Sequence, residues 1–300
     1  MTNNTDTLNG ALQELGETMA DNLTTMGVPS TYDEGLTTLA QKILSIGPTP
    51  PTPTPASVDL TGTKSILSYA DSEQSVLTAT VLDSNDNPVE GVDVNLYKGS
   101  TLWDTLTTDS SGECSKTYSS AGSGDITFTA EVDGTLLTKT YAIQDCKYWN
   151  DGTSVGSLEI ESGAICTSNG SYITLTTNTS GEKDVKLPVN LTGDWEFTTD
   201  IAELGTNQDL TFKVGSGSQW GAVDHASNRI TVNLGNGSNY YTKTISKDDT
   251  LKITYVNGSM SVYWNDEYLT SRTVSISGKM GYYQVNGRTY HIKNIKIKPL

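Results

Sequence analysis

Hydrophobic and polar residues follow two patterns along this 300-residue chain, and a proline-rich stretch separates them. Before residue 47, apolar side chains recur every three or four positions, which is the spacing of an amphipathic helix. After residue 56, apolar and polar side chains alternate in short runs bounded by Gly, Asn, Asp and Ser, which is typical of strands and turns. Residues 47–55 hold five of the nine prolines, so neither a helix nor a central strand continues through them.

The pattern therefore predicts four segments. Residues 1–46 form a helical head, and residues 47–56 form a semi-rigid Pro/Thr linker of extended backbone. Residues 57–146 and 147–300 form two β domains.

The head is expected to contain two helices, each with an apolar stripe. Gly27-Val28-Pro29 ends the first helix, and Thr31 with Glu34 resembles a capping box that opens the second. So small a segment rarely encloses a stable core. The stripes are therefore predicted to assemble with other copies of the chain or with a docking surface; the alternative is a helical hairpin packed on the chain's own β body. The assembly residues are Leu8, Leu12, Leu15, Met19, Leu23, Leu36, Leu39 and Ile43.

The β body is predicted to form two sandwiches. Residues 57–146 contain about seven short strands, a turn at 84–88 and an Asp133-Gly134 hairpin signal, as an immunoglobulin-like (Ig-like) domain does. In the last segment, the strands expected at 172–175, 195–201, 210–214, 229–234, 251–256 and 261–264 suit a two-sheet jelly roll, and Asn257-Gly258 predicts a tight hairpin. The expected fold class is thus mainly β, with a small N-terminal helical segment.

Charge and composition exclude several functions. The net charge is −16; residues 57–146 hold fourteen acids and four bases, whereas 147–300 hold fifteen and fourteen. Because nucleic-acid binding needs a basic surface, no nucleic-acid partner is expected. No apolar run reaches the roughly 20 residues that cross a bilayer, so no membrane insertion is expected. Residues 1–6 lack the basic and apolar features of a secretory leader, so synthesis without a signal peptide is expected.

The cysteines do not indicate a metal site or a disulfide framework. Cys114, Cys146 and Cys166 are widely spaced and form no CxxC pair. Buried free thiols are predicted, and a bridge between Cys114 and Cys146 is left open.

Candidate catalytic chemistry is sparse. The segments lack the paired acids of a glycosidase strand; Asp194, Glu196 and Asp200 share strand parity but are interpreted as exposed polar positions. Neither His225 nor His291 lies in a nucleophile motif. The Asp83–Asn87 turn offers oxygens that could bind calcium, but an Asx-rich turn is the favoured interpretation. We therefore expect no enzymatic activity, no metal and no cofactor.

Candidate ligand-binding residues are aromatic rings near polar groups, because rings stack on sugar faces while amides and carboxylates bind hydroxyls. Residues 215–225 look loop-rich and present Trp220, Asp224 and His225. Tyr240, Tyr241 and Tyr283 are further candidates, although only one member of each tyrosine pair (240/241 and 282/283) can face outward from a strand. The alternative is that these rings are core or sheet-surface residues. Trp149, Trp195 and Trp264 are interpreted as core or interdomain packing.

Three segments resemble known families. Residues 8–46, through Leu15, Ala20, Leu23, Gly27-Val28 and GLTTLAQKI at 35–43, resemble N-terminal regions of tailed-virus structural proteins, which implies attachment to or assembly with a virion. The sequence LTATVLDSNDNPVEGV at 77–92, with 107–112 and FTAEVDG at 128–134, resembles bacterial Ig-like domains of the invasin and intimin type, which implies a spacer; Asp86 replaces the usual Gly. The hairpin at 249–267 and the closing strand at 292–297 resemble concanavalin-like (laminin-G or glucanase type) sandwiches, which implies carbohydrate binding.

Together these features predict a non-enzymatic virion protein, a tail or head fibre or a capsid decoration. Residues 1–46 would bind other virion proteins and form a homo-oligomer, with a trimer assumed by analogy with fibres, and the C-terminal domain would bind a host-surface glycan. The alternatives are a secreted or cell-surface adhesin that binds carbohydrate, and a glycan hydrolase.

Overall fold

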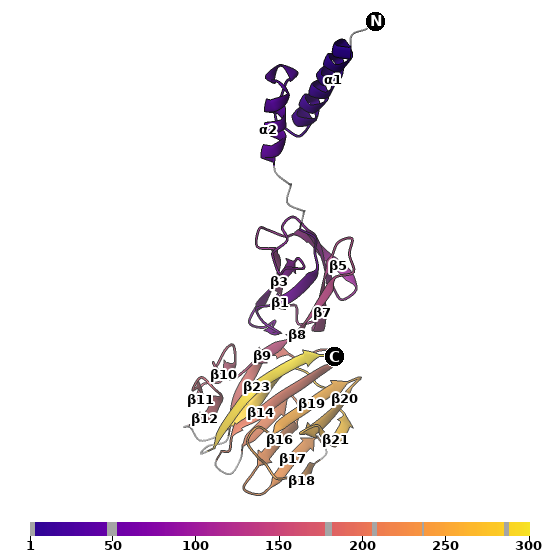
Figure 1. Cartoon of the computed structure of the whole chain (residues 1–300). Helices are drawn as coiled ribbons and strands as arrows, with labels where there is room; N and C mark the ends of the chain where they lie inside the picture. Colours follow the sequence, from indigo (N-terminus) through magenta and orange to yellow (C-terminus); the bar gives the residue numbers. More distant parts are fainter. Residues whose placement is uncertain (1–3, 47–52, 178–181, 206–208, 236, 285–287) are drawn as a thin grey trace. The chain divides into compact units, whose positions relative to one another are not determined.

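A computed structural model defines two compact units, Met1–Pro53 and Thr54–Leu300 (Figure 1). The structure describes residues 4–46, 53–177, 182–205, 209–235, 237–284 and 288–300. Most of the predicted linker, residues 47–52, lies outside the described residues.

The first unit is a helical hairpin. It contains α1 (Asn4–Thr25), the 3₁₀ turn η1 (Tyr32–Glu34) and α2 (Leu36–Ile46). The Thr31 backbone N–H donates to the Glu34 carboxylate at 3.2 Å, as a capping box requires. This box opens η1 and not α2, because the positive φ of Gly35 (+83°) interrupts the helical backbone before Leu36. The expected position of the second helix start is therefore wrong by one short turn.

The hairpin covers only part of its apolar stripes. Leu23 and Leu39 are fully buried with Ala20, and Met19 and Val28 pack against them. The Tyr32 ring lies so close to Gly16 that a Cβ there would approach it to 2.3 Å. Four predicted assembly residues remain exposed and Leu36 is half-buried; the exposed ones are Leu8 (59 %), Leu12 (39 %), Leu15 (51 %) and Ile43 (45 %). Neither helix of the described part is long and apolar enough to cross a membrane.

The second unit begins with an Ig-like sandwich. Its strands are β1 (Ser57–Gly62), β2 (Ile66–Ser68), β3 (Gln74–Leu82), β4 (Asp93–Lys98), β5 (Thr101–Thr107), β6 (Glu113–Ser119), β7 (Gly124–Val132) and β8 (Thr138–Cys146). One sheet has the order β1-β3-β6 and the other β2-β8-β7-β4-β5, with β2 parallel to β8. Alternate residues of β3 and β7 are buried, among them Leu77, Val81 and Phe128. The period-two pattern therefore supplies the core.

In the polar turn at residues 83–87, an aspartate side chain accepts hydrogen bonds from the backbone of the turn. The Asp83 carboxylate accepts the N–H groups of Asn85 at 2.8 Å and Asn87 at 2.9 Å. The hydrogen bonds from Asn87 and Asn85 hold the pKa of Asp83 below its usual value. This geometry is that of the favoured Asx-rich turn.

The remaining strands form a second, larger sandwich. They are β9 (Tyr148–Asn150), β10 (Glu159–Ile160), β11 (Ala164–Ser168), β12 (Ile173–Thr177), β13 (Lys183–Asn190), β14 (Trp195–Glu203), β15 (Leu210–Val214), β16 (Gln219–Asp224), β17 (Arg229–Leu234), β18 (Ser238–Thr242), β19 (Thr250–Val256), β20 (Ser259–Trp264), β21 (Glu267–Thr273), β22 (Lys279–Gln284) and β23 (Thr289–Pro299). One sheet is β10-β13-β22-β15-β16-β17-β18; the other is β11-β12-β23-β14-β19-β20-β21, with β9 also paired to β23.

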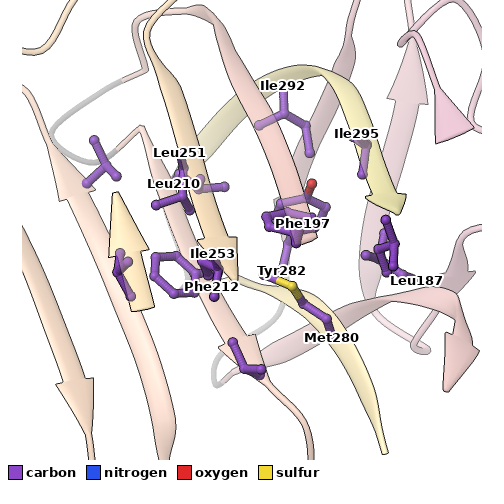
Figure 2. Packing of buried hydrophobic residues seen from close by; sticks show 14 of the residues in the cluster. Leu187, Phe197, Leu210, Phe212, Leu251, Ile253, Met280, Tyr282, Ile292 and Ile295 are labelled. Carbon is purple, nitrogen blue, oxygen red and sulfur yellow. The ribbon is translucent and has the colours of Figure 1, made fainter. Parts of the chain in front are cut away.

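The inner faces of these two sheets form one apolar core (Figure 2). Phe197 of β14 and Ile253 of β19 face Phe212 of β15 and Tyr282 of β22, and the Phe197 and Tyr282 rings lie 6.4 Å apart. Trp195 and Trp264 are almost fully buried. The Asn257-Gly258 hairpin joins β19 to β20, with φ values of +49° and +77° as a type I′ turn requires.

The cysteines are free thiols. Cys114 and Cys146 are buried and Cys166 is half-buried, so the bridge left open between Cys114 and Cys146 does not form. Burial raises the thiol pKa to about 11 for Cys114, about 12 for Cys146 and about 11 for Cys166.

Candidate ligand-binding face

Trp220 lies in the middle of a strand and not in a loop. The predicted loop-rich stretch turns at Gly215–Ser218, β16 follows at once, and the next turn begins at His225. Gly215 has φ +67°, and a Cβ there would meet the Ser277 carbonyl at 2.6 Å, which explains the glycine. Along β16, Val223 joins the core, so Trp220 and Asp224 point to the opposite, outer face of the sheet. Trp220 is half-buried there.

Two polar side chains flank Trp220 on neighbouring strands. Lys213 of β15 and Asn233 of β17 lie directly opposite Trp220 in the strand register. Directly opposed residues have Cβ atoms about 4.5–5.5 Å apart, so the Lys213 and Asn233 side chains leave the sheet on either side of the indole.

A tyrosine and an arginine lie together near the edge of the same face. Tyr240 of β18 is 64 % exposed and pairs with Thr231. The Arg229 guanidinium carbon is 5.2 Å from the centre of the Tyr240 ring. Tyr241, the next residue, pairs with Ile230 and packs against the core.

A second tyrosine with a cation lies on the other side of Trp220. Tyr283 of β22 pairs with Asp184, and the Lys213 Nζ is 4.0 Å from the centre of its ring. The same Nζ is 3.7 Å from the Asp184 carboxylate and 3.8 Å from that of Glu182. Tyr282 is fully buried, so each tyrosine pair presents one ring outward, as strand alternation predicted.

Small side chains lie between Trp220 and Tyr240. Ala222 pairs with Thr231, and both are over 90 % buried on the outer side of the sheet. We call this surface the aromatic face; its residues are Trp220, Tyr240, Tyr283, Lys213, Arg229, Asn233, Ala222 and Thr231.

The predicted residues Asp224 and His225 have local structural contacts. The Asp224 carboxylate accepts the Ser227 backbone N–H at 3.2 Å and the Ser227 hydroxyl at 3.1 Å. The His225 Nδ1 is 2.7 Å from the fully buried Asp209 carboxylate, which also accepts the His225 N–H at 2.9 Å. Both contacts fix the turn after β16.

The structure thus brings four of the six predicted residues to one face: Trp220, Asp224, Tyr240 and Tyr283. His225 lies at the end of a strand, and Tyr241 faces the core. Lys213, Asn233 and Arg229 were missed as ligand-binding candidates. Their outward parity was readable, because Lys213 alternates with Leu210, Phe212 and Val214, which belong to the core. Their proximity to Trp220 follows only from the pairing of separate strands.

Two other ionisable groups considered for chemistry, His291 and Asp200, are engaged in the fold. The His291 Nδ1 is 3.1 Å from the Thr174 hydroxyl, and burial lowers the pKa of the imidazole. The Asp200 carboxylate accepts the Thr250 hydroxyl and the Asn294 amide, each at 2.7 Å. Within the described ranges, no three His, Cys, Asp or Glu side chains are grouped so that they could hold a metal ion.

Comparisons with known proteins support the first sandwich by sequence. Residues 57–143 match the family model of the bacterial Ig-like domain, group 1. This match confirms the Ig-like resemblance of that segment. A search of curated protein sequences found no match.

Solved structures show weaker similarity. A protein of unknown function with a galectin-like fold from Bacillus subtilis is 11 % identical (TM-score 0.39), over 51 % of this chain and 95 % of that one. The carbohydrate-binding module CBM66 from Bacillus subtilis is 13 % identical (TM-score 0.33), over 45 % and 95 %. The D0-D1 domain of intimin is 16 % identical (TM-score 0.26), over 74 % and 94 %.

Proposed function

We propose that the C-terminal sandwich binds a saccharide through the aromatic face and that the Ig-like domain acts as a spacer. The observation that carries this proposal is the position of Trp220. Its half-exposed indole points away from the core, on a strand that lies between Lys213 and Asn233 of the neighbouring strands. An aromatic ring stacks on the apolar face of a sugar, while a neighbouring polar side chain such as the Asn233 amide binds its hydroxyl groups. Such a mixture of one large ring and few polar groups is typical of ligand sites.

We propose binding without catalysis. The Glu182 and Asp184 carboxylates both lie within 4 Å of the Lys213 ammonium and are held in ion pairs with it, and three strand spacings separate Asp184 on β13 from Asp224 on β16. That distance is about 14 Å, beyond the roughly 5–10 Å between the paired acids of glycosidases. Asp224 is also held by Ser227.

A glycan array followed by calorimetric titration tests the binding proposal. We expect the full-length chain to bind at least one glycan class, and Trp220→Ala to weaken this binding about tenfold or more, because stacking contributes on the order of 1–2 kcal/mol. The matched control is Tyr263→Ala. Tyr263 is a half-buried ring with Lys252 4.9 Å from its centre, but it lies on the other sheet. Equal losses in the two variants, or no bound glycan, would refute the proposal.

We further propose that the protein belongs to the virion of a tailed virus and that its helical hairpin is the attachment segment. The sequence pattern of residues 8–46 supports this proposal, and the exposed Leu8, Leu12 and Leu15 give the hairpin an apolar surface that another chain could cover. A trimer remains the assumed assembly. The Ig-like match favours a second candidate, a cell-surface adhesin.

Two measurements separate these candidates. Light-scattering mass should show a multimer for the full chain and a monomer for residues 54–300, if the hairpin assembles the protein. Mass spectrometry of purified virus particles should detect the chain in the virion. A monomeric full chain would exclude self-assembly, and detection on a cell surface but not in particles would favour the adhesin.

A further inference from the structure

A cationic side chain lies over each of the two tyrosine rings of the aromatic face. Lys213 lies over Tyr283, and Arg229 lies over Tyr240. A ring surface that contacts a cation cannot stack on a sugar at the same time. Among the described contacts no cation lies over Trp220, so Trp220 is the ring open for stacking and the tyrosines support the two cations.

The two cations differ in their surroundings. Lys213 has two carboxylates within 4 Å, those of Glu182 and Asp184. Arg229 pairs with Asp224 across the strands, but that carboxylate bonds Ser227 instead. Within the residues that the structure describes, no carboxylate lies within 4.0 Å of Arg229. In a chain of net charge −16, Arg229 is thus a cation without an acidic partner.

The position of Arg229 relative to Trp220 suits one extended ligand. Tyr240 lies two strands and two residues away from Trp220, because Trp220 pairs with Asn233 and Asn233 with Ser238. These offsets place the two backbone positions about 12 Å apart. That is roughly the span of two linked sugar units. The guanidinium over Tyr240 therefore reaches a unit next to the one stacked on Trp220.

We propose that the saccharide bound by the aromatic face is anionic, with its acidic group held by Arg229. This inference rests on the proposed function and adds the ligand class. The planar guanidinium presents donors in a fork that fits a carboxylate or a phosphate. Tyr240 holds that fork in place, which lowers the conformational freedom lost on binding.

The test compares acidic glycans with their neutral counterparts on the full-length chain. The array contains sialylated and uronate-bearing glycans, phosphorylated glycans, and the same structures without the acidic group. We expect acidic members to bind at least about tenfold more tightly than their neutral counterparts, and Arg229→Gln to remove this ratio. The carboxylate and phosphate pairs reveal which acid is bound. Higher salt, about 0.5 M against 0.05 M, should shrink the ratio.

Controls make each outcome decisive. Arg272→Gln, an exposed arginine of β21 in the other sheet, should leave the ratio unchanged. Trp220→Ala should weaken acidic and neutral glycans alike. If glycans bind but the neutral forms bind equally well, or if Arg229→Gln keeps the ratio, the anionic ligand is refuted and the glycan-binding proposal stands. If no glycan binds, both proposals fail.

Discussion

Asp145 offers the sharpest test of the forces that hold the Ig-like domain together. Its carboxylate is fully buried at the end of β8 and accepts the Tyr118 hydroxyl at 2.6 Å, the Ser123 hydroxyl at 2.8 Å and the Ala121 N–H at 3.1 Å. The Ser123 N–H and the Ser120 hydroxyl complete the set. Burial alone would raise the pKa of Asp145, but the hydrogen bonds from Ser120, Tyr118 and Ser123 outweigh it and lower the pKa from 3.8 to about 2.

This shift converts into stability. A difference of about two pKa units corresponds to about 2.5 kcal/mol in favour of the folded, ionised state. Because the folded pKa lies below the unfolded one, this contribution is fully present above about pH 4 and is lost as the pH falls towards 2. Asp145→Asn keeps the shape of the side chain but removes the charge. We therefore expect it to reduce the free energy of unfolding by about 2–3 kcal/mol at pH 7.

Urea unfolding at pH 7, 5 and 3, monitored by hydrogen exchange of peptides from β7 and β8, measures this difference. The gap between wild type and Asp145→Asn should be widest at pH 7 and should shrink at pH 3. The control is Asp59→Asn. The Asp59 side chain is 57 % exposed and lies 3.3 Å from Lys139, so its loss should cost under about 1 kcal/mol. The reasoning would be refuted if Asp145→Asn lowered the free energy of unfolding by as little as Asp59→Asn does, or if the loss did not depend on pH.

Three further predictions concern the hairpin, a turn and the thiols. Leu39→Ala should reduce the helical circular dichroism signal, because replacing a fully buried leucine by alanine costs about 2–5 kcal/mol in so small a core. Leu12→Ser, at an exposed position, should keep the signal and lower only the mass of the assembly, and an equal loss of helix in both variants would contradict the burial. Gly258→Ala should cost about 1 kcal/mol in thermal unfolding, since φ is +77° and no close atom blocks the methyl group; an unchanged melting temperature would contradict this. Cys114 and Cys146 should stay unmodified by a thiol reagent at pH 8 and react after unfolding, because burial raises their pKa to about 11 and about 12; fast reaction of the folded protein would contradict this.

Local sequence patterns predicted the strands well, because hydrophobic alternation and turn residues act within a few residues of one another. The Asn257-Gly258 turn needs positive φ at both positions, and these residues adopt it readily. The ranges expected for β15 and β17 match the structure, since their core residues alternate strictly. The capping box was also identified, but the glycine after it decides where α2 begins.

The ligand-binding face depends on pairing between distant strands, which no local pattern contains. The glycines and serines before Trp220 favour a turn, so the stretch looked like a loop. Trp220 is a strand residue because it pairs with Lys213 of β15 on one side and with Asn233 of β17 on the other. The same register places Arg229 beside Tyr240, so its role could not be predicted from the sequence.

The most direct test of saccharide binding at the aromatic face is hydroxyl-radical footprinting with a glycan found by the array. Oxidation of Trp220 should fall several-fold when the glycan is present, while oxidation of Tyr263, on the outer side of the other sheet, should not change. Protection of Trp220 and Tyr240 together would place the ligand on the proposed surface. Protection of Tyr263 with Trp220 unprotected would show that the saccharide binds elsewhere and would contradict the proposal.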